Sequence, residues 1–461
     1  MDFPLFHLDF FGNRLLIAVI ATVHVLINHM LAVGAIPLIA TLEWRGLRTG
    51  DQRWDRLAYR SLWVCFIITT SLGALTGVGI WLSTSLVNPQ AIGSLIRVFF
   101  WAWFFEWTVF VTEVVLILLY ALTWKTAWKQ RHPRGHLALG WALAAFSWLT
   151  MAVIVAILGF QMDTGVWTVQ PGFWTAVLNP VYLPQLAFRT PFALVSAALF
   201  ILALTAFFTR HDPSFRARAI RFVSGWALVF TGPWLAGAWA YWRVIPEPML
   251  DNLSTAMTTL AFADFLGPLR WILAASVGAV VLVGLWGVLA PRRLPALVLV
   301  VPALLAVWQL SYFERVREFI RKPDVIEAYM YSNGLRASDY PLYAEDGLLP
   351  HASYASVDEV TEANTLEAGR EMFRLTCSRC HTTHGVNGVV EKLAAMYGWQ
   401  DWDPQTVRSY LGSMHNARPF MPPLPGTDAE KTALAEYLVA LRNDPAGLHG
   451  AQTHGMPQRT R

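Results

Sequence analysis

The chain contains a series of long apolar segments, and this series limits its fold more than any other feature. Eight segments have roughly the 20 residues needed to cross about 30 Å of hydrocarbon. Their approximate limits are 14–42, 60–87, 97–124, 137–160, 186–209, 219–243, 267–290 and 294–317. Because backbone polar groups in lipid must pair within the chain, and the connections are short, we predict a compact all-α membrane bundle. With 55% hydrophobic and 14% charged residues, the composition excludes a soluble enzyme.

Basic residues between the segments predict the orientation of the bundle. The connections after the first, third, fifth and seventh segments carry Arg45, Arg48, Arg53, Arg56, Arg60, Lys125, Lys129, Arg131, Arg134, Arg210, Arg216, Arg218, Arg221, Arg292 and Arg293. The opposite side has only Arg97, Arg189, Arg243 and Arg270, all at helix ends. By the positive-inside rule the first set is cytoplasmic, so both termini are expected outside the cytoplasm. The net charge of +4 therefore reflects membrane topology, and no nucleic-acid partner is expected.

A haem-attachment motif, Cys377-Ser378-Arg379-Cys380-His381, follows the last apolar segment. Its two thiols can form thioethers with the two vinyl groups of one haem, and the next residue presents an imidazole to the iron. Covalent haem attachment takes place outside the cytoplasm, so the motif and the basic residues predict the same side. The alternative is a small zinc site. Cys65 lies inside the second segment as a small buried residue, and no disulfide is expected.

Residues 360–445 resemble a small class I cytochrome c. Asn364 and Glu367 are expected to cap a helix that runs into the haem motif. Thr427 and Glu430 predict a second capping box, which opens a helix with an apolar side. This order of elements implies an all-α cytochrome c domain.

The resemblance also implies the axial ligands of this haem. His381 belongs to the motif, and Met421 in Met421-Pro422-Pro423 is the expected second ligand. Met414, His384 and His415 are alternative second ligands. We therefore expect one covalent haem c with His381 and Met421 bound to its iron.

Four parts are expected along the chain: a membrane bundle at 1–320, a periplasmic connector at 321–359, the cytochrome c domain at 360–445 and a flexible tail at 446–461. The connector is too rich in tyrosine to be a flexible linker, so we expect it to pack and hold the haem domain in place. No cleavable signal is expected, because Met1 to Asn13 lacks a basic region.

Ionisable side chains inside the apolar segments are costly in lipid, so each is a candidate for function. His24 and His29 lie five residues apart in the first segment and point to different faces of a helix. Glu106 and Glu113 lie seven apart in the third, on one helix face and about 10.5 Å apart along its axis. A buried carboxyl group can hold and pass a proton, so this pair predicts a proton relay. The alternatives are a histidine bonded to a neighbouring helix and a structural carboxylate pair bonded to Ser, Thr or Trp.

A charged run, Glu314-Arg315-Val316-Arg317-Glu318-Phe319-Ile320-Arg321-Lys322-Pro323, marks the outer end of the last segment. Charges at a helix end either act in function or anchor the helix at the membrane interface. Both interpretations remain open from the residues alone.

Taken together, these positions resemble subunit I of the cytochrome bd oxygen reductases over roughly residues 10–322. The matching motifs are the step from Arg14 to His24, the glycine-rich Ser71–Gly77, the pair Glu106 and Glu113, Leu178-Asn179-Pro180-Val181, and Glu318-Phe319-Ile320-Arg321-Lys322-Pro323. The two glutamates are one residue closer together than in the family. The resemblance implies that His24 and Glu318 are axial ligands of two closely spaced high-spin haems, of b or d type. It also implies that Arg321 contacts haem propionates, a role suited to its planar fork.

The chain departs from that family at the low-spin haem and at the quinol site. The family holds a low-spin haem b with a His and a Met, but here these positions are Arg189 and Ile272, neither of which can ligate iron. The long loop that handles quinol is reduced to residues 243–266, and a ninth span is absent. The resemblance is therefore to the haem-c-bearing branch of the superfamily that lacks the quinol site. In that branch haem c takes over the entry of electrons.

The resemblance implies a terminal oxidase of the bacterial inner membrane, with its haem c domain in the periplasm. A periplasmic donor such as a cytochrome c would reduce haem c, and the high-spin pair would reduce O₂. Glu106, Glu113 and Glu318 are the predicted catalytic residues, and a second membrane subunit of bd type is the expected partner. The alternatives are a non-catalytic electron-transfer subunit, a reductase of another small diatomic such as NO, and a plain anchor for a cytochrome c.

Overall fold

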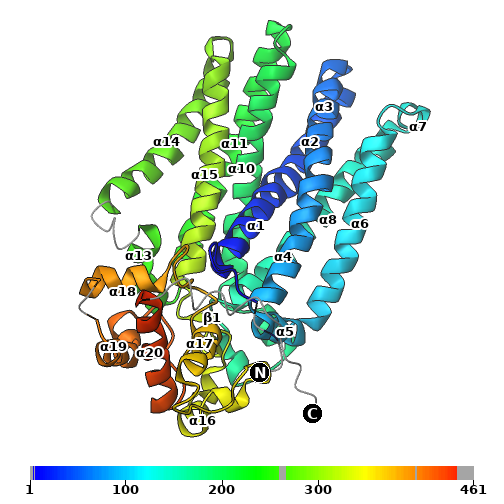
Figure 1. Ribbon diagram of the computed structural model, residues 1–461. Coiled ribbons are helices and arrows are strands. Elements are labelled where there is room, and N and C mark those ends of the chain that lie inside the picture. Colours follow the sequence, from blue (N-terminus) through cyan, green and yellow to red (C-terminus); the bar gives the residue numbers. More distant parts are fainter. Residues whose placement is uncertain (1–3, 5, 259–265, 400–401, 444–461) are drawn as a thin grey trace. The chain divides into compact units, whose positions relative to one another are not determined.

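The structure is a computed structural model, and it describes residues 4, 6–258, 266–399 and 402–443. Contacts within the chain divide it into two compact units. The bundle unit comprises residues 21–79 and 95–320, and the C-terminal unit comprises residues 1–20, 80–94 and 321–461. The long helices of the bundle unit are the largest elements in Figure 1. The predicted flexible tail, 446–461, lies outside the described residues.

Two long helices begin the chain, and each contains a π-helical segment. The first consists of α1 (Asn13–Ile27), η1 (Asn28–Gly34) and α2 (Ala35–Thr49). The second consists of α3 (Gln52–Ile68), η2 (Thr69–Gly73) and α4 (Ala74–Val87). Asp51 lies between them and caps α3, because its carboxylate accepts a hydrogen bond from the Arg53 backbone N–H. The segments η1 and η2 contact each other, and π segments inside α-helices are frequent at functional sites.

The remaining helices of this part of the chain are mostly long and joined by short connections. They are α5 (Pro89–Val98), α6 (Phe100–Thr123), α7 (Ala127–Arg131), α8 (Pro133–Phe160), η3 (Gly165–Thr168), α9 (Phe173–Val177), α10 (Tyr182–Phe208), α11 (Pro213–Trp242), α12 (Glu247–Asp251), α13 (Leu253–Met257), α14 (Leu266–Leu289), η5 (Pro291–Arg293) and α15 (Ala296–Ile320). Helix α10 contacts α8, α11, α15 and η1, so it lies at the centre of the packing. Its buried alanines Ala193, Ala197 and Ala198 let these neighbours approach closely, as small residues do in membrane bundles.

Seven helices of the described residues are long and apolar enough to cross a membrane. They are Asn13–Thr49, Gln52–Val87, Phe100–Thr123, Pro133–Phe160, Tyr182–Phe208, Gly267–Leu289 and Ala296–Ile320. The eighth predicted span, 219–243, forms part of α11, a 30-residue helix whose Trp, Gly and Pro content lowers its mean hydropathy. The predicted all-α membrane bundle is confirmed, and the chain is an integral membrane protein. The crossing by α11 stays a prediction.

The C-terminal unit begins with a small hairpin and continues as short helices. The antiparallel strands β1 (Asp324–Ile326) and β2 (Met330–Tyr331) pair Asp324 with Tyr331 and Ile326 with Met330. The helical elements that follow are η6 (Ala337–Asp339), α16 (Tyr340–Asp346), η7 (Leu349–His351), α17 (Thr365–Thr376), α18 (Val389–Tyr397), α19 (Pro404–Ala417) and α20 (Asp428–Asn443).

The core of the C-terminal unit lies where α17 crosses α20. The apolar side predicted for α20 is confirmed, because Leu434, Tyr437, Leu438 and Leu441 are all buried. The crossing is close: a Cβ added to Gly369 of α17 would lie 2.1 Å from a backbone carbonyl oxygen of α20. Connector residues between 335 and 352 belong to the same core. The connector is therefore packed, as its aromatic content predicts.

Of the two predicted helix caps, one is confirmed and one is wrong. The Thr427 backbone N–H donates to Glu430 Oε2 at 2.9 Å, and the Glu430 N–H donates to Thr427 Oγ1 at 3.4 Å, as a capping box requires. Asn364 does precede α17, but its side chain accepts from the Thr361 N–H and donates to the Glu359 carbonyl. These bonds to the preceding turn replace the predicted cap, because Asn side chains also stabilise turns.

Candidate functional site

The haem-attachment motif forms the turn that follows α17. The Cys377 N–H donates to the Phe373 carbonyl, and the His381 N–H donates to the Cys377 carbonyl, both at 2.9 Å. Nδ1 of His381 lies 3.0 Å from the Asn387 carbonyl oxygen. A carbonyl can only accept, so Nδ1 carries the proton and Nε2 keeps its lone pair for iron. Burial lowers the pKa of His381 to about 4, which keeps the imidazole in the neutral form that binds metal.

The geometry fits a haem better than the zinc alternative. A structural zinc site needs four protein ligands, and the described part of the chain has no group of three or more His, Cys, Asp or Glu that could hold a metal ion. The turn instead supplies two free thiols, Cys377 and Cys380, and one imidazole. This donor set matches the two thioethers and single axial nitrogen of a haem c.

The second axial ligand is less well defined than the first. Met421 is half-buried, and its carbonyl accepts a hydrogen bond from Nδ1 of His415 at 2.6 Å. Met414 packs against the core that also borders Cys377. His384 Nδ1 lies 3.4 Å from a carboxylate oxygen of Glu391. Met421 as the iron ligand stays a prediction.

Residues from the start of the chain are bound to the haem motif. The Val386 N–H donates to the Phe10 carbonyl at 2.8 Å. Nη2 of Arg379, inside the motif, donates to Gln90 Oε1 at 2.9 Å, and its Nη1 donates to the Leu375 carbonyl. The motif is therefore fixed to the segments 6–12 and 80–94, which lie at the ends of the first two long helices.

Within the bundle unit, the structure brings His24 and the glycine-rich motif Ser71–Gly77 together. Nδ1 of His24 lies 3.2 Å from the Gly73 carbonyl oxygen and 3.2 Å from Thr76 Oγ1. A Cβ added to Gly77 would lie 3.1 Å from Cε1 of His24, so any larger residue there would require the ring to shift slightly. With Nδ1 bonded to the backbone, Nε2 is the nitrogen left for iron, as in most metal-binding histidines.

The two glutamates of α6 lie on one face of the helix in different surroundings. Glu113 accepts hydrogen bonds from Ser147 Oγ at 2.7 Å and Thr150 Oγ1 at 3.1 Å, both on α8. These are the hydroxyl partners expected of a structural carboxylate. Glu106 is half-buried and makes no side-chain hydrogen bond to any residue that the structure describes. Tyr120, seven residues beyond Glu113, continues the same stripe.

His29 belongs to a buried ion network rather than to a pair with His24. Its Nδ1 lies 3.1 Å from the Val25 carbonyl oxygen, and its Nε2 accepts from Arg189 Nη1 at 3.1 Å. Arg189 Nη1 also lies 2.7 Å from Glu314 Oε1, and Arg317 Nε donates to Glu314 Oε2 at 3.0 Å. The interpretation of Glu314 and Arg317 as interface anchors is therefore wrong, because both are buried inside the bundle unit.

A second buried network was not found from the sequence. Glu43 is fully buried and accepts from Tyr120 Oη at 2.7 Å, while its Oε1 lies 2.6 Å from His136 Nδ1 and 3.1 Å from Lys129 Nζ. Lys129 Nζ also donates to Asp55 at 2.6 Å. The only signal was the position of Glu43, one residue past the limit of an apolar segment, and its partners come from distant parts of the chain.

Glu318 and Arg321 lie on either side of the point in the sequence where the bundle unit ends, between residues 320 and 321. Glu318 is half-buried in the last turn of α15, and Arg321 is buried in the C-terminal unit. Their roles as ligand and propionate partner stay predictions. Arg189 and Ile272, the two positions at which the chain has no residue able to ligate iron, differ in environment. Arg189 is 1% exposed, whereas Ile272 is 54% exposed on α14.

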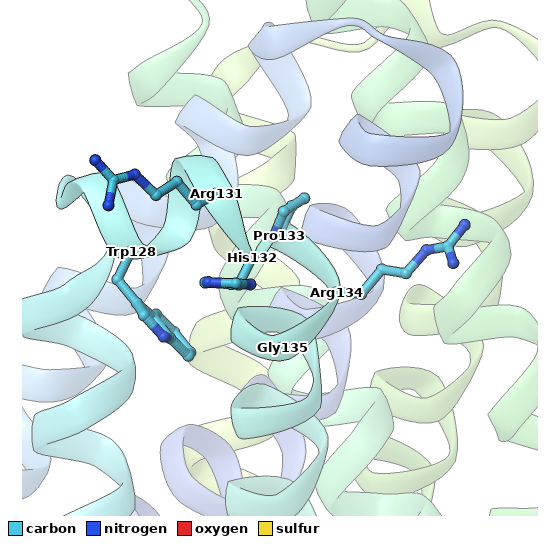
Figure 2. Close-up of a pocket in the computed structure, with 6 residues that line it drawn as sticks. All are labelled: Trp128, Arg131, His132, Pro133, Arg134 and Gly135. Carbon is cyan, nitrogen blue, oxygen red and sulfur yellow. The ribbon is translucent and has the colours of Figure 1, made fainter.

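A surface pocket of about 650 Å³ lies where α7 meets α8. Its lining residues are Trp128, Arg131, His132, Pro133, Arg134 and Gly135. Figure 2 shows Arg131 and Arg134 extending in different directions, so their guanidinium groups do not converge on one point. None of the predicted ligands lines this pocket, and we assign it no role in catalysis.

Two parts of the chain are similar to known protein families. Residues 13–239 match the model of cytochrome bd terminal oxidase subunit I, and residues 364–438 match that of the cbb3-type cytochrome c oxidase subunit III. The structure of bd oxidase from Geobacillus thermodenitrificans is similar with a TM-score of 0.55 and 17% identity. The similarity covers 69% of this chain and 91% of that chain, and at this identity it shows the fold alone. No curated protein matches the chain.

Proposed function

Because the chain belongs to the cytochrome bd terminal oxidase subunit I family, and carries a cytochrome c domain, we propose that this membrane haem oxidoreductase reduces O₂. Electrons would enter through one covalent haem c at Cys377, Cys380 and His381. They would pass to two high-spin haems in the bundle, where O₂ is reduced to water. The haem types, b or d, are left open by the protein ligands.

The observation that carries the proposal is the contrast between two positions in the bundle unit. His24 is held through Nδ1 with Nε2 left over, as a haem ligand requires. Arg189, in the position of the family's low-spin ligand, is engaged with His29 and Glu314 and has no atom that binds iron. A chain that keeps the high-spin ligand, lacks the low-spin one and adds haem c is organised to receive electrons from haem c.

The proposed roles of the chain's own residues follow from their chemistry. His24 and Glu318 would each supply one axial ligand, and Arg321 would pair with propionates through its planar fork. A high-spin haem supplies the open coordination position at which O₂ binds. His24 would be kept in a single orientation by the backbone of η2 and by the absence of a side chain at Gly77.

Reduction of O₂ to water consumes protons, and the stripe on α6 is the proposed supply. Glu113 is held by two hydroxyl groups, each of which can exchange a proton with it. Glu106, two turns away, would carry protons further along the same face. This division of roles is supported by Glu113, whose carboxyl is bonded to two hydroxyl groups, and by Glu106, whose carboxyl has no hydrogen-bond partner within the described part of the chain.

The proposed setting is the bacterial inner membrane, with the haem c domain in the periplasm. A periplasmic donor such as a cytochrome c would reduce haem c, and a second membrane subunit of bd type would complete the complex. The basic connections between the apolar segments support this orientation.

Replacement of Glu318 by alanine in the purified complex tests the proposal. We expect loss of one high-spin haem signal and of O₂ uptake, while the haem c spectrum is unchanged. The matched control is Glu247→Ala, because Glu247 is an exposed carboxylate on α12. A Glu318→Ala protein with full high-spin signals and full O₂ uptake would refute the proposal.

Two measurements on the unaltered protein separate the rival functions. A pyridine haemochrome assay counts c, b and d haems, and carbon monoxide shifts the reduced spectrum only if an iron has an open position. A haem count of c alone, or no shift, would favour a non-catalytic electron-transfer subunit. A shift with NO consumption and no O₂ uptake would favour a reductase of a different diatomic.

A further inference from the structure

The ion network of His29, Arg189, Glu314 and Arg317 contains buried N–H groups that have no acceptor among the described residues. Nε and Nη2 of Arg189 and Nη1 of Arg317 are buried and have no hydrogen-bond partner among the residues that the structure describes. Both side chains lie almost fully inside the bundle unit. A charged donor left without an acceptor in the interior is destabilising, so native proteins rarely leave one unpaired.

The neighbours of these arginines engage only some of their N–H groups. His29 donates Nδ1–H to a carbonyl, so it is neutral and occupies only Nη1 of Arg189. Glu314 is shared by both arginines, with one oxygen for each. The Arg189 guanidinium also lies 5.2 Å from the centroid of the Phe313 ring, which helps to fix its plane. The Arg189 guanidinium group is thus held in place, while its Nε and Nη2 have no acceptor among the described residues.

A carboxylate is the group that best completes such a site. The parallel N–H groups of a guanidinium match the two oxygens of a carboxylate, and such paired bonds are among the strongest in proteins. The network lies close to both proposed iron ligands along their own helices, since His29 follows His24 by five residues and Arg317 directly precedes Glu318. The carboxylates that accompany a haem at such ligands are its two propionates.

We propose that Arg189 and Arg317 bind a propionate of one of the high-spin haems, and that His29 and Glu314 are positioning residues for the two arginines. The inference rests on the proposed function, because that function supplies the haem. It gives Arg189 a positive role: the position that ligates a low-spin iron in the family serves here to bind an anion.

The test is a spectroelectrochemical titration of the high-spin haems in the intact complex. A buried cation beside a haem stabilises the reduced form, which carries one positive charge less than the oxidised form. Arg189→Gln removes this charge and is therefore expected to lower the midpoint potential of the haem that Arg189 contacts. We expect at least a tenfold change in the equilibrium constant for reduction, which is about 59 mV for a one-electron couple. Glu314→Gln removes a negative charge and is expected to raise the same potential.

Two further proteins, and one measurement made on every variant, keep the test independent of misfolding. Arg243→Gln removes an exposed arginine at the end of α11 and is the matched control. Arg189→Lys keeps the charge but loses the fork, so its potential is expected between those of the wild type and Arg189→Gln. Full haem c content in each protein shows that the chain has folded and matured.

The outcomes separate this inference from the proposed function. A wild-type protein that contains only haem c would overturn the proposed function and this inference with it. High-spin haems that are present, but whose potentials in Arg189→Gln and Glu314→Gln equal that of the Arg243→Gln control, would overturn this inference alone. A wild-type potential that changes with added formate would show that a free anion, not a propionate, occupies the site, and would also overturn it.

Discussion

The hydroxyl group of Tyr120 donates a 2.7 Å hydrogen bond to Glu43, and neither side chain reaches solvent. Tyr120 lies on α6 and Glu43 on α2, so the bond joins two membrane helices that are remote in sequence. Tyr120 binds Oε2, and Lys129 and His136 approach the other oxygen, Oε1, of the same carboxylate. Glu43 is therefore the common acceptor of three buried donors.

Replacing Glu43 by leucine is expected to destabilise the bundle strongly. The change leaves Lys129 without one of its two carboxylates and leaves Tyr120 and His136 without an acceptor, and breaking a buried pair costs about 3–5 kcal/mol. Tyr120→Phe removes only one hydrogen bond, which costs on the order of 1 kcal/mol. Thermal unfolding in detergent, followed by circular dichroism, compares the two. Equal unfolding temperatures for Glu43→Leu and Tyr120→Phe would contradict this ranking.

Replacing Glu113 by glutamine is expected to slow O₂ uptake without removing any haem. The amide keeps the size of the side chain and can still accept from Ser147 and Thr150, but it cannot carry a proton. A lost proton-transfer group lowers rates by on the order of 100-fold. Ser147→Ala removes one partner and should have a much smaller effect. Oxygen uptake with excess reductant is the measurement, and an unchanged rate in Glu113→Gln would exclude Glu113 from proton supply.

Substituting alanine for Gly77 is expected to disturb the haem bound at His24. The added Cβ would lie 3.1 Å from Cε1 of His24, so the imidazole must move. Gly225→Ala is the control, because a Cβ there meets no atom within 4 Å. We expect an altered high-spin spectrum in Gly77→Ala and a normal one in Gly225→Ala. Identical spectra would show that the position of the His24 ring does not depend on Gly77.

Asp324 is expected to make the stability of the chain depend on pH. Burial raises the pKa of Asp324 to about 7, and nearby Glu327 raises it too, although Arg321 and Lys322 oppose them. In the unfolded chain an aspartate has a pKa of about 3.9. Between these values the folded state holds a proton that the unfolded state has released. Stability therefore falls as the pH rises from about 4 to about 7.

The Asp324→Asn protein tests this expectation. It should lose this part of the pH dependence, because the amide does not titrate. Glu345→Gln, at an exposed carboxylate of α16, should keep the wild-type profile. Unfolding temperatures measured between pH 4 and pH 7.5 compare the three proteins. A wild-type slope that survives in Asp324→Asn would assign the effect to another group.

The membrane helices could be predicted from the sequence because hydropathy reports lipid crossing directly. The residues at which these helices end could not be predicted in this way. The first segment was placed at 14–42, but its helix continues to Thr49 through Glu43, since a helix can extend beyond the hydrocarbon with charged residues. The haem motif was equally readable, because its ligands are adjacent in the chain. The π segments η1 and η2 leave no clear trace in composition.

The two buried ion networks, around Glu43 and around Arg189, could not be predicted from the sequence for a different reason. The partners of Glu43 lie 77 and 93 residues away, and Arg189 lies 160 residues from His29. Such pairs depend on which helices become neighbours, and hydropathy does not determine that. An arginine side chain cannot ligate iron in any surroundings, so the sequence alone excludes that role for Arg189, whereas its partners appeared only in the folded chain.

The hydrogen bond between Val386 and Phe10 has a consequence for biogenesis. Phe10 is translated long before Val386, which is made only after helix α15. Residues 6–12 must therefore wait for this partner until the domain that contains Val386 has been made. Closure of this contact therefore belongs to a late stage of assembly, so a substitution that disturbs residues 6–12 is expected to act on the last domain to be made rather than on insertion of the first helices.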